Sequence, residues 1–249
     1  MKAIITDLDR TLLHTDKSVS EHTIAVLKRC RDRGMLIMAA SARPLRAILP
    51  YHNLIGFDAI TATNGAVVSL PQNLLETGIP CENGEKILSA IAQYPDVILS
   101  VETSNGLYAN REIPVWEPVI WNRFPALPEN IILYKILASS QQKPLYEGIE
   151  SMLTDDVYHT IANNDLIQIM SKRATKWNGI KHMLSHFNIF ARDAVYFGDD
   201  NDDIEPIKNC GLGVAVANAI PAVLAAADHI TAGNDQDGVA NFLENAILA

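Results

Sequence analysis

Residues 2–11 of the chain, KAIITDLDRT, form a short apolar run that ends in two carboxylates, Asp7 and Asp9. The run has the length and apolar character of a buried parallel strand. Side chains at i and i+2 of a strand point to the same face, so Asp7 and Asp9 lie together where open α/β sheets bind ligands. Two neighbouring anions repel each other unless a cation or a proton intervenes, so the pair predicts a divalent cation. The alternative is a polar turn at the end of a strand.

A second apolar run ends in acidic residues at 196–203, YFGDDNDD. It carries four carboxylates within five residues: Asp199, Asp200, Asp202 and Asp203. Oxygen ligands without histidine or cysteine favour magnesium over a softer metal. A solvated acidic loop is the alternative for this run alone, but two acidic strand ends in one sheet favour a shared metal site.

Two further polar groups lie where they can hold a phosphate. Ser41, Ala42 and Arg43 follow an apolar run at 35–40 and precede a helical pattern, and a hydroxyl and backbone N–H groups there can bind a phosphate oxygen. Lys176, near the start of a later helical pattern, can neutralise phosphate charge. The alternatives are a plain helix N-cap and a surface lysine.

The order of the expected elements divides the chain into a core and an insertion. Residues 1–80 alternate strand and helix patterns, and the alternation returns at 173–249, which predicts a doubly wound, mostly parallel α/β sheet. Residues 81–172 show the order α, β, β, β, α, β, β, with a hairpin expected around Asn163-Asn164. We therefore expect one catalytic core, residues 1–80 and 173–249, interrupted by an inserted α+β domain.

The composition excludes several classes of protein. The formal net charge is −9 and no cluster of Lys and Arg occurs, which argues against a nucleic-acid partner. No apolar run reaches the ~18 residues of a membrane span, and the first residues lack the pattern of a signal peptide. Cys30, Cys81 and Cys210 form no CxxC pair, so we expect the reducing cytoplasm.

These motifs, in this order, resemble the haloacid dehalogenase superfamily of phosphatases. The resemblance is closest to the Cof-type branch, in which a large α+β cap is inserted between the second and third motifs. It extends over nearly the whole chain. Four more segments contribute to it: 63–66 (TNGA), 211–219 (GLGVAVANA), 228–231 (DHIT) and 237–240 (DGVA).

The resemblance implies Mg²⁺ as cofactor and a covalent aspartyl-phosphate intermediate. Asp7 would be the nucleophile and a metal ligand. Asp9 would be the general acid and base, with its backbone carbonyl on the metal. Asp199 would be a further metal ligand, and Asp203 would support the metal site.

The resemblance also implies a phosphate-binding set. Thr11 would orient the loop after the first strand. Ser41 and the amide of Ala42 would hold the transferring phosphoryl group, and Lys176 would bridge that group and the nucleophile. Asp202 would lie beside the phosphate.

Four positions depart from the usual pattern of the family. Arg10, Ala42 and Trp177 stand where glycine is common, and Asp202 stands where asparagine is expected. A residue other than glycine at position 10 implies that φ need not be positive there. The extra anion of Asp202 is expected to weaken phosphate binding or to demand more metal. None of the four removes a group that makes or breaks a bond.

We therefore predict a Mg²⁺-dependent phosphomonoester hydrolase acting on a small phosphorylated metabolite: a sugar phosphate, a nucleotide or a phosphorylated cofactor. A phosphomutase of the same superfamily is one alternative, and product analysis with a sugar bisphosphate distinguishes the two. A receiver-like module that stores a phosphoryl group is the other, although Asp9 would make such a phosphate short-lived. Residues 81–172 contain no motif that identifies the substrate.

Overall fold

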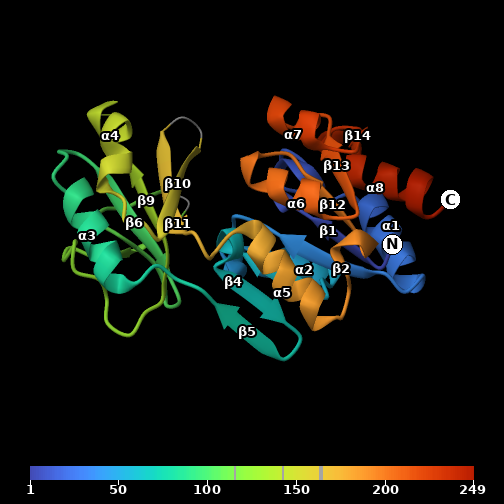
Figure 1. Cartoon of the computed structure of the whole chain (residues 1–249), viewed down its shortest axis with the longest axis horizontal. Coiled ribbons are helices and arrows are strands. Elements are labelled where there is room, and N and C mark those ends of the chain that lie inside the picture. Colours follow the sequence, from blue (N-terminus) through green and yellow to red (C-terminus); the bar gives the residue numbers. More distant parts are fainter. Residues whose placement is uncertain (115, 142, 163–164) are drawn as a thin grey trace. The chain divides into compact units, whose positions relative to one another are not determined.

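The computed structural model describes the chain except Val115, Gln142, Asn163 and Asn164 (Figure 1). It forms two compact units, Met1–Leu75 with Thr175–Ala249, and Glu76–Ala174. The sequence analysis placed the corresponding boundaries after residues 80 and 172. The expected turn at Asn163-Asn164 lies outside the described residues.

The first unit is built on one eight-stranded sheet with the order β14-β13-β12-β1-β2-β3-β4-β5. From β14 to β3 each strand pairs in parallel with its neighbour, and β4 pairs with β3 antiparallel. The strands are β1 (Ala3–Thr6), β2 (Leu36–Ala40), β3 (Ala59–Ala62), β4 (Val67–Leu70), β5 (Asn73–Glu76), β12 (Ala194–Gly198), β13 (Leu212–Val216) and β14 (His229–Thr231).

The helices of this unit form two packed groups, as a doubly wound sheet requires. Helix α1 packs against α2 and α8, whereas α6 packs against α5 and α7. The helices are α1 (Glu21–Asp32), α2 (Leu45–Ile55), α5 (Lys176–His186), α6 (Ile204–Asn209), α7 (Pro221–Ala226) and α8 (Gly238–Phe242). All residues of β1, β3 and β12 are buried, because helices on both faces leave a central strand no exposed side. The predicted α/β class is confirmed.

Helix α5 is anchored at both ends of its first turn. The hydroxyl of Thr175 accepts the backbone N–H of Asn178 at 3.1 Å and caps the helix. Gly65, at φ +98°, approaches Thr175 so closely that a Cβ would lie 2.0 Å from its carbonyl oxygen. One turn into the helix, a Cβ on Gly179 would lie 1.8 Å from the hydroxyl of Thr61 on β3. These two glycines let α5 lie close to the sheet, which fixes the position of Lys176.

The second unit is an α+β fold on a six-stranded sheet with the order β10-β11-β9-β6-β7-β8. All its pairs are antiparallel except β7 with β8. The apolar sides of α3 and of the segment after β9 pack with strand residues into a separate hydrophobic core. The elements are α3 (Cys81–Ile91), β6 (Ile98–Thr103), β7 (Gly106–Ala109), β8 (Val119–Ile120), β9 (Leu133–Ser139), α4 (Lys143–Gly148), β10 (Val157–Ala162) and β11 (Leu166–Ser171).

Short turns complete the chain. A π-type turn at Leu8–Leu12 follows β1, and another at Leu243–Ile247 continues α8. The remaining short turns are 3₁₀ turns at Thr63–Gly65, Ile149–Met152, Ala191–Asp193, Asn201–Asp203 and Asn234–Gln236. None of the described helices combines the length and the apolarity that a membrane crossing requires.

Candidate active site

The predicted site residues meet at the carboxyl edge of the parallel sheet. Strand β1 lies between β2 and β12, so the residues that follow these three strands are neighbours. The backbone N–H of Asp7 donates to the carbonyl of Phe197 at 2.9 Å, and that of Ser41 donates to Thr61 at 2.9 Å. Asp7, Ser41 and Asp199 therefore begin their loops side by side.

Three carboxylates form a compact oxygen cluster. Asp7, Asp199 and Asp203 are all buried, and each offers an oxygen within 4.8 Å of the other two. Lys176 Nζ lies 3.1 Å from Asp7 Oδ1 and 2.6 Å from Asp203 Oδ1. The lysine side chain is 4% exposed, so the predicted alternative of a surface lysine does not apply.

Both carboxylate oxygens of Asp203 accept hydrogen bonds from the protein. Oδ1 accepts from Lys176 Nζ and, at 2.5 Å, from the hydroxyl of Tyr196. Oδ2 accepts the backbone N–H groups of Asp199 at 2.8 Å and of Asp200 at 3.0 Å. Asp203 thereby fixes both the lysine and the loop that carries Asp199.

Burial and neighbouring charges shift the pKa values of Asp7, Asp199 and Lys176. Burial, followed by the charges of Asp203 and Asp199, raises the pKa of Asp7 well above its ordinary value despite Lys176. Burial likewise raises the pKa of Asp199 to about 6. Burial lowers the pKa of Lys176, but the neighbouring carboxylates, Asp203 first, outweigh burial and raise it. The carboxylates thus carry more negative charge than one lysine offsets.

The turn at Leu8–Leu12 corrects one expectation. Arg10 adopts φ +58°, so the prediction that φ need not be positive there is wrong. Left-handed backbone costs a residue other than glycine roughly 1–2 kcal/mol. Reciprocal contacts hold it: Arg10 Nη2 donates to the carbonyl of Asn218 at 3.3 Å, and Asn218 Nδ2 donates to the carbonyl of Arg10 at 2.8 Å. Arg10 also lies 3.8 Å from Asp199, and Thr11 donates to Asp199 Oδ1 at 2.8 Å.

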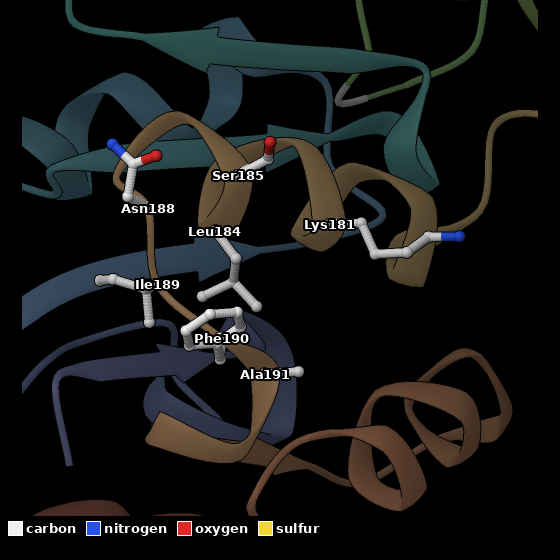
Figure 2. A pocket seen from close by; sticks show the side chains of 7 residues that line it. All are labelled: Lys181, Leu184, Ser185, Asn188, Ile189, Phe190 and Ala191. Carbon is white, nitrogen blue, oxygen red and sulfur yellow. The ribbon is translucent and has the colours of Figure 1, made fainter.

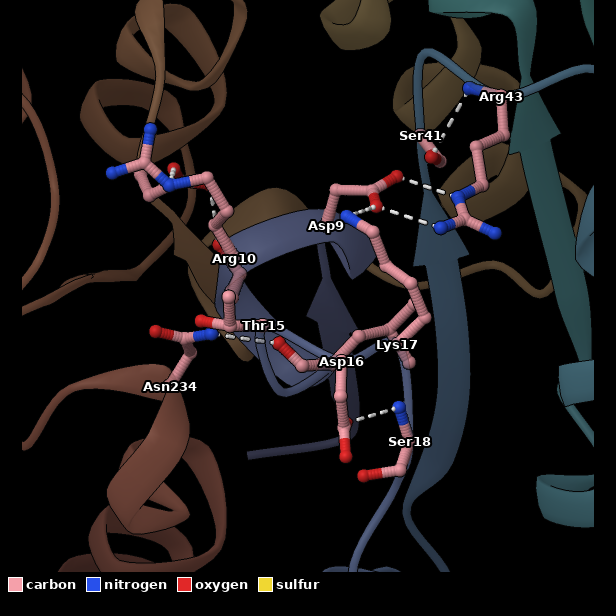
Figure 3. A network of polar contacts seen from close by, with 12 residues as sticks. Asp9, Arg10, Thr15, Asp16, Lys17, Ser18, Ser41, Arg43 and Asn234 are labelled. Carbon is pink, nitrogen blue, oxygen red and sulfur yellow. Dashed lines mark hydrogen bonds and ion pairs between the residues drawn. The ribbon is translucent and has the colours of Figure 1, made fainter. Parts of the chain in front are cut away.

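Asp9 is paired with two cations (Figure 3). Arg43 donates through Nε to Oδ2 at 2.5 Å and through Nη2 to Oδ1 at 2.7 Å, and Lys17 Nζ donates to Oδ1 at 2.7 Å. Burial raises the pKa of Asp9, but the hydrogen bonds from Arg43 and Lys17 outweigh burial and lower it. Sequence analysis missed Lys17 because nothing in its neighbourhood marks it; only the path of the loop after β1 brings it to Asp9.

A small cavity of about 130 Å³ lies over this edge. Asp202, whose carboxylate accepts from Asn64 Nδ2, belongs to its wall, so the aspartate at this position does face the site. The residues lining the cavity are Asp7, Asp9, Arg10, Ser41, Ala42, Lys176, Asp199, Asp200 and Asp202.

A larger hollow of about 390 Å³ lies elsewhere on the first unit (Figure 2). The second half of α5 and the segment after it form its wall, with Leu184, Ile189 and Phe190 supplying apolar surface. The residues that line it include none of the predicted site residues, so size alone does not identify the site.

Fold and site together define an α/β enzyme with an acidic, lysine-bridged centre at the carboxyl edge of its sheet. Residues 4–243 match the model of the haloacid dehalogenase-like hydrolases, and the chain belongs to that family. The predicted family is therefore confirmed.

Named relatives and solved structures agree over nearly full length. 5-Amino-6-(5-phospho-D-ribitylamino)uracil phosphatase YitU of Bacillus subtilis is 26% identical, with 97% of this chain and 96% of the relative covered. A phosphoglycolate phosphatase of Methanococcoides burtonii is 27% identical, with 99% and 97% covered. The structure of a haloacid dehalogenase-like hydrolase from B. subtilis has a TM-score of 0.86 at 22% identity, covering 99% of this chain and all of that one.

Proposed function

We propose that the chain is a Mg²⁺-dependent phosphatase that hydrolyses a small phosphomonoester through an aspartyl-phosphate at Asp7. The phosphatase class is supported by family membership and by the named relatives. The observation that carries the finer proposal is the bridge of Lys176 from Asp7 to Asp203 beside Asp199. The bridge supports the proposal because it sets a cation beside the proposed nucleophile and beside oxygens that would suit a metal ion.

The carboxylate cluster fits the proposed metal. Its donors are oxygens only. The raised pKa values of Asp7 and Asp199 indicate negative charge that the surrounding protein does not compensate. Asp7, Asp199 and the backbone carbonyl of Asp9 would hold Mg²⁺, and Asp203, whose oxygens already accept four hydrogen bonds, would support them. When bound, the ion would offset charge on the phosphoryl oxygens.

The protein groups then divide the reaction between them. A carboxylate oxygen of Asp7 attacks phosphorus, and the bond from phosphorus to the ester oxygen breaks. Asp9 gives its proton to that leaving oxygen and later takes one from the water that cleaves the aspartyl phosphate. Ser41, the amide of Ala42 and Lys176 hold the phosphoryl oxygens during both steps.

We assign substrate selection to the second unit, Glu76–Ala174. The first unit supplies all groups of the proposed chemistry, so the inserted unit is free to differ between relatives. Two of those relatives are named for different small phosphorylated substrates, which is consistent with this division. The substrate of this chain would be another such metabolite.

Turnover of p-nitrophenyl phosphate with and without chelator tests the metal and the enzyme class. We expect repeated turnover that is lost with chelator and restored by Mg²⁺ better than by Zn²⁺. Full activity in chelator-treated protein would contradict the metal assignment. A single turnover that stops would favour the receiver-like module, and transfer of phosphate to a second hydroxyl of a sugar bisphosphate would favour a mutase.

A comparison of Asp7→Asn with Asp9→Asn tests the division of roles. Asp7→Asn should abolish turnover of every substrate, because the nucleophile is gone. Asp9→Asn should release about one equivalent of p-nitrophenol in a burst and then stop, because that leaving group needs no proton but the aspartyl phosphate still needs a base. General acid/base help is worth ~10²–10⁴-fold. Rapid mixing with intact-mass analysis detects the phosphorylated protein, and a phosphoryl group on another residue refutes the assignment.

A further inference from the structure

Asp9, Lys17 and Arg43 form a charged group at the edge of the cavity, called here the Asp9 clamp. Asp9 is the one acidic member, and both its oxygens accept from the clamp's two cations at 2.5–2.7 Å. Two positive charges oppose one negative charge, so the clamp carries an excess positive charge in a protein of net charge −9. Asp16, the acid next to Lys17 in sequence, directs its carboxylate to the backbone N–H of Ser18 (Figure 3).

The two cations are held in place by more than Asp9. The hydroxyl of Tyr51 accepts from Arg43 Nη1 at 3.3 Å and donates to the carbonyl of Lys17 at 3.1 Å. The guanidinium carbon of Arg43 also lies 5.2 Å from the centre of the Tyr51 ring. Lys17 itself has φ +70°, a strained backbone conformation. The hydrogen bond from its backbone N–H to the carbonyl of His14 helps to maintain this conformation. Tyr51 therefore holds the guanidinium of Arg43 and the backbone of Lys17 near their positions when Asp9 moves.

The clamp conflicts with the role proposed for Asp9. A carboxyl that donates to the leaving oxygen cannot keep both oxygens on Arg43 and Lys17. Its departure leaves two cations, 21% and 50% exposed, without the carboxylate they share. An anion of the substrate can replace that carboxylate, since a guanidinium fork fits carboxylate and phosphate alike.

We propose that the site prefers phosphomonoesters whose alcohol portion carries an anionic group, a carboxylate or a second phosphate, and that Lys17 and Arg43 bind this group. Binding the anion releases Asp9 to the leaving oxygen, so the anion contributes to kcat as well as to KM. The inference rests on the proposed phosphatase function and adds the substrate class and two residues of the first unit that select for charge, while the second unit selects among the metabolites that carry it.

The test uses three substrates of similar size with the full-length protein and Mg²⁺. They are 2-phosphoglycolate, with a carboxylate; ethane-1,2-diol bisphosphate, with a second phosphate; and 2-hydroxyethyl phosphate, with neither. We expect kcat/KM at least about 10-fold higher for one or both anionic compounds than for the neutral one. The faster of the two anionic compounds identifies the anion.

Variants then assign the preference to the clamp. Lys17→Gln should lower the preference about 5-fold. Arg43→Lys keeps the charge but loses the paired N–H donors of the guanidinium. It should lower the preference for the anionic substrates through kcat. The matched control is Lys28→Gln on the exposed side of α1, which removes the same charge and should leave the preference unchanged.

Equal kcat/KM for all three substrates would overturn the inference, as would a preference that Lys17→Gln and Arg43→Lys leave intact. These outcomes are distinct from failure of the proposed function. A phosphatase without the proposed preference still turns over p-nitrophenyl phosphate repeatedly, whereas a protein that hydrolyses none of the four compounds contradicts both proposals.

Discussion

Gly179→Ala tests whether the close approach of α5 to β3 positions Lys176. A methyl group at this position would lie 1.8 Å from Thr61 Oγ1, so the two must separate by about 1.6 Å to reach ordinary contact at 3.4 Å. Overpacking of this kind costs about 1–3 kcal/mol, and replacing glycine within a helix returns about 0.5–1 kcal/mol. We therefore expect a net loss of about 1–2 kcal/mol in the free energy of unfolding.

The same displacement should reach the active site. Lys176 lies one turn before Gly179, and its contacts of 3.1 Å to Asp7 and 2.6 Å to Asp203 do not survive a shift of an ångström. Misplacement on this scale costs up to about 10²-fold in rate. We expect kcat on p-nitrophenyl phosphate to fall about 10- to 100-fold.

Chemical denaturation and steady-state kinetics check the two effects in the same set of variants. Ser185→Ala, on the exposed part of α5, gains helix propensity without the clash and serves as the control. Thr61→Ala removes a buried hydroxyl that has no hydrogen-bond partner among the described residues, and in the double variant it should recover much of both losses. A Gly179→Ala protein that is more stable than wild type and equally active would refute the reasoning.

Three further predictions concern other parts of the chain. Asp202→Asn removes an anion from the cavity wall, so KM for the phosphate ester or the Mg²⁺ concentration needed for half-maximal activity should fall severalfold. Michaelis constants measured across a series of Mg²⁺ concentrations test this prediction, and no change in either quantity would show that the extra charge is without effect. A chain in which a short linker replaces the second unit should fold, hydrolyse p-nitrophenyl phosphate and keep the preference for an anionic alcohol portion that Lys17 and Arg43 provide. It should no longer discriminate among metabolites that carry the same anion, and retained discrimination among these would place all selectivity in the first unit. Asp237 accepts hydrogen bonds from Ser20, His14 and Thr23; burial raises its pKa, but these bonds outweigh burial and lower it below 3.8. Its contribution to stability is therefore present above pH 3.8 and lost as the pH falls through the lowered pKa. Denaturation midpoints of Asp237→Asn should lie below those of wild type at pH 7 and converge with them below about pH 4, and a constant difference would refute the link.

The parallel strands β1, β2, β3 and β12 were predictable because each is a largely buried apolar run followed by a polar residue. β1 lies within the first run, at 2–11, and β12 ends within the second, at 196–203, and their acidic ends meet as strand order requires. Strand β4, which pairs antiparallel with β3, and strand β5 were, by contrast, not predicted. β5 is mostly exposed, so it lacks the apolar pattern that marks a buried strand.

The site was predictable where it follows a strand end and not where it depends on tertiary packing. Asp7, Ser41 and Asp199 are directly connected to buried strands. Lys17 reaches Asp9 through an irregular loop, and no local pattern encodes that path. Arg10 shows the limit of propensity arguments: contacts with Asn218, far away in the sequence, hold a left-handed arginine that sequence rules disfavour.

Thr175 is the joint at which the chain passes from the inserted unit back into the first unit, and its position has a consequence for the evolution of the fold. The inserted unit ends at Ala174, and the next two residues are the cap of α5 and Lys176. Because Gly65 and the capping bond fix Thr175 within the first unit, changes of length or sequence upstream of the joint need not displace the lysine. The insertion can therefore be remodelled for a new metabolite while the catalytic unit stays as it is, a form of modularity that depends on one glycine and one threonine.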